Sequence, residues 1–159
     1  MSRRLAWLAA AAAAAAVVAA ALVLQGRAAG SVTLTPDDAR VVALGESVYR
    51  THCAACHGAR LEGQPHWRER RPDGLMPAPP HDATGHTWHH PDDVLFRITK
   101  LGVGKVARMP EYKSAMPPYD GVLTDAQIVA VLSWIKAQWP PEIRARQAEI
   151  DRRHRESGR

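Results

Sequence analysis

The chain has 159 residues and a formal net charge of +5. Three arginines precede position 30, so residues 30–159 carry 18 basic against 16 acidic side chains, a balance of +2. Nucleic-acid-binding domains usually present a basic face with stacking aromatic residues, and the near-neutral balance argues against that class. The length leaves room for one small domain after a targeting segment.

The first 30 residues have the features of a membrane-targeting segment. Two arginines are followed by Leu5 to Leu24, twenty residues without a charge or a helix breaker. As a helix this run is about 30 Å long, enough to cross the hydrocarbon core of a bilayer. We expect an uncleaved signal-anchor, and the alternative is a signal peptide cleaved near the small residues at 26–28. Because the arginines stay on the cytoplasmic side, both interpretations place the remaining chain on the outer side of the membrane.

The first helix of the following domain is predicted from Thr35 to about Arg50. Thr35 suits the N-cap, Pro36 suits the first turn, and the two acids that follow suit the positive end of the helix dipole. Gly45 is costly inside a helix, so we expect it to allow the close approach of another helix. The predicted inner face consists of Val41, Leu44, Gly45, Val48 and Tyr49.

The segment 53–57 has the spacing of a covalent haem attachment site. Cys53 and Cys56 are the only cysteines, and on one helical turn they can reach the two vinyl groups of a single haem. His57 follows directly and can turn its imidazole to the iron. A thioredoxin-like pair would need a preceding strand, and a structural zinc site would need a second pair of ligands. A disulfide would leave His57 without a role.

Three motifs give the chain a resemblance to class I (mono-haem) c-type cytochromes. They occupy residues 52–58, 115–119 and 123–128, and the likeness extends over about 35–139. The resemblance implies an all-α, cytochrome c-like fold, with several helices around one covalently bound haem c per chain. It makes the C-terminal helix, at Val131 and Trp134, the partner of Gly45. Haem is attached to similar proteins outside the cytoplasm, so we expect the periplasmic side of the bacterial inner membrane, or the soluble periplasm if the N-terminal segment is cleaved.

Residues 58–80 are rich in glycine, proline and charge, which predicts a loop. In similar cytochromes a proline carbonyl in this region accepts the Nδ1 hydrogen of the axial histidine, and Pro79 is the nearest match. Four histidines follow, and they suggest a copper site, a contact from Trp88 or a histidine to a haem propionate, bis-histidine iron ligation, or only a polar loop over the haem edge. These histidines are His81, His86, His89 and His90.

Two methionines are candidates for the second axial ligand of the iron. Met109 and Met116 each precede a proline, which disfavours helix and suits a ligand carried on an extended loop. Met109 lies among charged residues, as on an exposed surface, whereas the family pattern places its ligand at Met116. Met76 is expected to fill the core. A thioether ligand favours Fe(II) and raises the reduction potential, whereas a second histidine would lower it.

Two further helices complete the predicted haem domain, which we assign to residues 31–141. One starts within residues 90–93 and ends near 101–102, with Leu95 and Ile98 toward the haem or its surrounding core. The other begins with a capping box at Thr124 and ends before the prolines at 140–141. The charged tail, 142–159, mixes signs at helical spacing, which usually indicates a solvated face; the alternative is that it steers an acidic partner.

These features predict a one-electron carrier rather than an enzyme. Cys53 and Cys56 would hold the haem, and His57 and Met116 would ligate its iron, so no residue is needed as acid, base or nucleophile. The expected partners are redox proteins such as a respiratory complex, an oxidase or a copper protein, with membrane contact through the N-terminal segment. The alternatives are a haem enzyme or a redox or gas sensor with an open or displaceable sixth ligand position, and a copper-handling module based on the histidines at 81–90.

Overall fold

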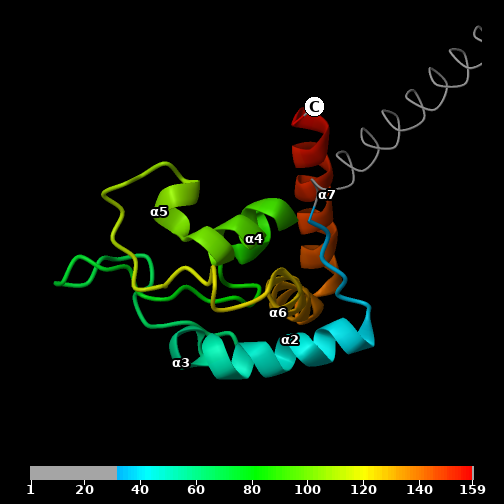
Figure 1. Ribbon diagram of the computed structural model, residues 1–159, viewed down its shortest axis with the longest axis horizontal. Helices are drawn as coiled ribbons and strands as arrows, with labels where there is room; N and C mark the ends of the chain where they lie inside the picture. The colour runs from blue at the N-terminus through cyan, green and yellow to red at the C-terminus, as the bar shows by residue number, and fades with distance from the viewer. Residues whose placement is uncertain (1–31, 159) are drawn as a thin grey trace, which may run out of the picture. The chain divides into compact units, whose positions relative to one another are not determined.

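Helices make up the regular secondary structure of residues 32–158, the part of the chain that the computed structural model describes (Figure 1). Within these residues there is no β-strand, and one isolated parallel bridge joins Met76 to Ser114. The all-α prediction is therefore confirmed for this range. The elements are α2 (Ala39–His52), α3 (Ala54–His57), the 3-10 helix η1 (Thr87–His89), α4 (Asp92–Leu101), α5 (Val103–Val106), α6 (Asp125–Ala137) and α7 (Pro141–Ser157).

The helix α2 begins later than the sequence pattern predicts. Thr35 is not its cap; its carbonyl accepts a hydrogen bond from the Asp38 backbone, closing a turn before the helix. Asp38 is the N-cap, and its carboxylate accepts from the N–H groups of Arg40 and Val41. A carboxylate satisfies two unpaired amides of the first turn, which explains why it takes the cap position from the threonine.

Gly45 brings α2 into close contact with α6, as predicted. A Cβ atom at this position would lie 2.6 Å from the Ala130 carbonyl carbon and 2.7 Å from the Trp134 Cβ, distances that no real Cβ atom tolerates. Val48 and Tyr49 are buried on the same face. Leu44 is 44% exposed, which corrects the predicted inner face. Each residue turns a helix by about 100°, so Leu44 lies at the edge of the face that Gly45, Val48 and Tyr49 bury, not at its centre.

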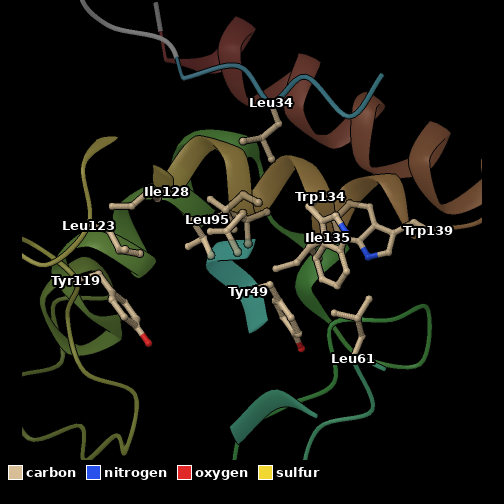
Figure 2. Close-up of a cluster of buried hydrophobic side chains, with 13 residues drawn as sticks. Leu34, Tyr49, Leu61, Leu95, Tyr119, Leu123, Ile128, Trp134, Ile135 and Trp139 are labelled. Carbon is tan, nitrogen blue, oxygen red and sulfur yellow. The ribbon is translucent and has the colours of Figure 1, made fainter. Parts of the chain in front are cut away.

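The helix α6 forms the centre of the core (Figure 2). Its predicted capping box is present, with Thr124 and Gln127 bonded reciprocally. Trp134 packs its ring on Tyr49, with the ring centroids 4.6 Å apart. The buried hydrophobic residues are Leu34, Val48, Tyr49, Leu61, Leu95, Tyr119, Leu123, Ile128, Ala130, Val131, Leu132, Trp134, Ile135 and Trp139.

The helix α4 has the predicted bounds and packs against α6. It begins at Asp92 and ends at Leu101, where Gly102 adopts a φ of 85° and stops the helix. Leu95 is buried and Ile98 is partly buried. The backbone of α4 also holds the loop that leads to α6, because Thr99 and Lys100 carbonyls accept from the N–H groups at 119 and 120.

The charged segment that follows Pro140 forms α7, and one side of this helix is buried. Gln147 is 0% exposed and Asp151 is 5% exposed. The Gln147 Nε2 donates to Asp92 Oδ1, 2.7 Å away, and the Asp92 N–H donates to Asp151 Oδ1, 3.0 Å away. The solvated face expected from the mixed charges therefore describes only the outer side of α7.

The predicted N-terminal segment, 1–30, lies outside the described residues. No helix between residues 32 and 158 is both long and apolar enough to cross a membrane.

Candidate haem site

The motif 53–57 forms one helical turn that continues directly from α2. Cys53 lies between α2 and α3, and its carbonyl accepts from the His57 N–H at 2.9 Å. Both thiols are free: Cys53 is partly buried and Cys56 is exposed. Burial, with a smaller contribution from Cys56, raises the pKa of the Cys53 thiol to about 11. Two reduced thiols on the same turn fit the two thioether bonds of a covalent haem.

His57 is held in the orientation that an axial ligand requires. Its side chain is buried, with 6% of its surface exposed, and its Nδ1 lies 2.8 Å from the Pro79 carbonyl oxygen. A carbonyl can only accept, so Nδ1 carries the hydrogen and Nε2 keeps its lone pair for a metal. Burial lowers the pKa of His57, which favours this neutral form. The sequence expectation for Pro79 is confirmed, and the donor set fits haem iron.

A second imidazole lies against the first, which the sequence does not predict. The rings of His57 and His81 are stacked, with their centroids 3.9 Å apart and their planes 20° apart. The Nδ1 of His81 lies 2.7 Å from the Thr87 Oγ1. Desolvation lowers the pKa of His81 well below its ordinary value, so this ring is neutral near pH 7. His81 therefore packs beside the ring of His57.

The remaining histidines of the loop do not converge with His81 on one point. His86 stacks on Trp67, with centroids 5.3 Å apart, and meets the ring of His90 edge-on at 5.6 Å. His89 packs on Trp88 at 3.7 Å. Among residues 32–158, no group of three or more histidine, cysteine or acidic side chains is placed to hold a metal ion. The hypothesis of a copper site in this loop has no support from the geometry.

Two tyrosine hydroxyls hold the backbone on either side of the motif. Tyr49, from α2, donates to the Gly58 carbonyl at 2.8 Å. Tyr119, from the loop before α6, donates to the His52 carbonyl at 2.7 Å. In Figure 2 both hydroxyl oxygens lie at the ends of the rings that point away from α6. Burial raises the pKa of both phenols, so they remain donors at neutral pH.

The two candidate methionine ligands differ in their surroundings. Met116 is partly buried and packs against the hydrophobic core, and its N–H donates to the Ser114 Oγ at 3.1 Å. Met109 is 49% exposed. The bridge from Ser114 to Met76 places the Met116 loop beside the loop that follows the haem motif (Figure 1). These surroundings favour Met116 over Met109 as a ligand.

Sequence reasoning missed the roles of three residues near the site. Tyr49 was expected only as a core residue, Tyr119 only as part of a family motif, and His81 only as a member of the histidine group. Their partners lie 9, 67 and 24 positions away in sequence: Gly58, His52 and His57. Hydrophobic periodicity does not predict contacts between residues so far apart in sequence. A buried tyrosine, however, indicates that its hydroxyl has a hydrogen-bond partner.

The helical fold and the cysteine–histidine turn define a protein that carries a covalently attached haem. The family model described as Cytochrome c matches residues 42–139, more than half of the chain. The chain belongs to the cytochrome c family, and its cofactor is haem c with its iron. Members of this family transfer electrons to and from redox partner proteins and are typically carriers rather than enzymes. Comparison with the curated proteins and with the solved structures found no match.

Proposed function

We propose that this protein is a one-electron carrier whose haem is attached through Cys53 and Cys56 and whose iron is ligated by His57 and Met116. The single observation that carries the proposal is the 2.8 Å contact between His57 Nδ1 and the Pro79 carbonyl. That contact fixes the ring and leaves Nε2 free, which a histidine without a ligand role would not require. The partial burial of Met116 against the core supports the second ligand.

The surrounding residues suit electron transfer because they change little between oxidation states. When bound, the haem supplies the Fe(III)/Fe(II) couple. The chain holds His57 through Pro79 and through the stacked ring of His81, and it fixes both ends of the motif through Tyr49 and Tyr119. A site held in this way does not need to rearrange when the charge on the iron changes. The Met116 sulfur, a soft donor, favours Fe(II) and raises the reduction potential.

An optical experiment tests the axial ligands. The ferric protein should show the weak near-infrared band of sulfur-to-iron charge transfer. Met116→Ala should remove this band and lower the reduction potential, because a water molecule or a nitrogen ligand then replaces the thioether at the iron. Met109→Ala is the matched control and should keep the band, since Met109 is exposed. Loss of the band in Met109→Ala but not in Met116→Ala would reverse the assignment. A wild-type protein that lacks the band and readily binds carbon monoxide when reduced would instead favour an enzyme or sensor.

We also propose that the haem domain works on the periplasmic side of the bacterial inner membrane, anchored by residues 1–30. The support is the uncharged run from Leu5 to Leu24 behind two arginines. When the full chain is expressed together with haem-assembly machinery, it should remain with the membrane after washing in high salt. Protease added from the periplasmic side should digest its haem domain. Recovery of the haem protein in the soluble periplasmic fraction would instead show that the segment is cleaved.

A further inference from the structure

The loop that carries Met116 has a direct connection to the haem-attachment motif through Tyr119. This residue lies three positions after Met116, and its hydroxyl donates to the carbonyl of His52, the residue that precedes Cys53. Its ring also meets the His52 ring edge-on, with centroids 6.2 Å apart and planes at 87°. Tyr119 is 9% exposed, and its bond to the His52 carbonyl is partly buried. Within the described chain, no other hydrogen bond joins the segment 107–124 to α2 or α3.

The connection between Met116 and Tyr119 is stiff. Pro117 and Pro118 occupy the two positions between them, and each proline fixes its own φ and restricts the residue before it. At the far end, the Tyr119 N–H donates to the Thr99 carbonyl at 3.1 Å. A displacement of the Tyr119 ring is therefore transmitted to Met116 instead of being absorbed by a flexible link.

We propose that Tyr119 is a positioning residue that holds the Met116 loop against the haem-attachment motif and so keeps the sixth ligand on the iron. This inference depends on the proposed ligation by Met116. The tyrosine hydroxyl closes a ring of contacts from the motif, through Tyr119 and the two prolines, to the ligand. Removing the hydroxyl opens that ring without disturbing the apolar packing of the phenyl group.

Tyr49 offers a matched control for this role. Its hydroxyl makes the same kind of bond, to the Gly58 carbonyl at 2.8 Å, on the other side of the motif. Tyr49 belongs to α2 and is not part of the loop that carries Met116. Tyr49→Phe and Tyr119→Phe therefore remove one partly buried hydroxyl each, and only Tyr119 belongs to the loop that carries Met116.

Imidazole binding to the ferric holoprotein tests the proposal, because exogenous imidazole must displace Met116 to reach the iron. We expect Tyr119→Phe to bind imidazole about fivefold more tightly than wild type, the factor that corresponds to about 1 kcal/mol for one hydrogen bond. Loss of the sulfur-to-iron band should follow the same titration. The imidazole affinity of Tyr49→Phe should stay within about twofold of the wild-type value, a smaller change than the loss of one hydrogen bond would produce. Pro118→Ala keeps the hydroxyl but loosens the link, so it should also tighten imidazole binding.

The outcomes separate this proposal from the one on which it rests. A wild-type protein with no sulfur-to-iron band overturns the ligation by Met116 and this inference with it. A normal band in wild type, with equal imidazole affinity in the two tyrosine variants, overturns only the role of Tyr119. Urea unfolding of both variants, followed by circular dichroism at 222 nm, gives the loss of global stability. If imidazole affinity rose in both variants in proportion to their loss of global stability, and not in Tyr119→Phe alone, the proposal would also be contradicted.

Discussion

The absence of a side chain at Gly45 determines how closely α2 and α6 approach. Ala130 and Trp134 of α6 occupy the space where a Cβ atom at this position would lie. Separation of α2 from α6 would also pull Tyr49 away from Trp134, because both residues lie on the same contact. A single backbone position therefore controls the packing that supports the haem-attachment turn at the end of α2.

Gly45→Ala should destabilise the holoprotein by about 1–3 kcal/mol, the usual cost of overpacking a core. Helix propensity alone would give the opposite sign, a gain of up to about 1 kcal/mol. Urea unfolding followed by circular dichroism measures the change. Ala43→Gly, at an exposed position of the same helix, is the control and should cost about 1 kcal/mol through propensity. A stabilised Gly45→Ala variant would show that the helices can separate without penalty.

At the scale of the helix, α4 depends on α7 for its N-terminal cap. Pro91 occupies the N-cap position and makes no side-chain hydrogen bond to the helix. The Asp151 carboxylate of α7 accepts from the Asp92 N–H instead, across 59 positions of sequence. Asp151 also pairs with Arg155. The α7 helix is therefore part of the support for α4, although it lies beyond the residues that the family model matches.

Asp151→Ala should lower the free energy of unfolding by about 1–2 kcal/mol, because it leaves a buried amide without a cap. Asp151→Asn keeps an oxygen acceptor at the same place and should recover most of this loss. Glu149→Ala removes an acid of the same helix that forms only exposed pairs with arginines, and it should change stability little. Equal losses in the alanine and asparagine variants of Asp151 would argue that its charge, and not the cap, matters. Thermal unfolding of the three holoproteins makes the comparison.

Across the whole molecule, one buried carboxylate joins four segments of the chain. Asp92 accepts hydrogen bonds from the Leu34 N–H, from Lys136 of α6 and from Gln147 of α7. The Lys136 Nζ lies 3.0 Å from its Oδ1, and both side chains are nearly inaccessible. Such a pair is weak evidence for stability in itself, but losing one partner leaves a buried charge unpaired.

A chain without its haem should keep part of its helix content and lose the order of the loops. The loops 58–91 and 102–123 contribute few residues to the core, so a large apolar cofactor is needed to bury their inner surfaces. Cys53→Ala together with Cys56→Ala prevents covalent attachment. We expect this double variant to retain much of the far-ultraviolet circular dichroism but to lose the near-ultraviolet signal of its tryptophans. A double variant that kept the near-ultraviolet tryptophan signal of the wild-type holoprotein would contradict this expectation.

The local elements could be predicted because the groups that decide them are close in sequence. The Cys53–His57 spacing fits one helical turn, and the Thr124 capping box closes within three residues. Gly102 ends α4 at the position where a left-handed backbone is required. In each case the relevant energy comes from residues within one or two turns. The family resemblance added Pro79, which composition alone could not separate from the other prolines of its loop.

Tertiary structure alone decided which distant groups meet. The bond from Tyr119 to the His52 carbonyl spans 67 positions, and the cap from Asp151 to α4 spans 59. The stacking of His81 on His57 and the outward position of Leu44 also depend on how the helices and loops pack. Hydrophobic periodicity indicates which side of an element is buried. The hydrophobic effect is non-directional, so this pattern does not predict which residues come into contact. The sequence therefore determined the helices and the haem-attachment turn, and packing determined the contacts that hold its histidine and the loop of its proposed second ligand.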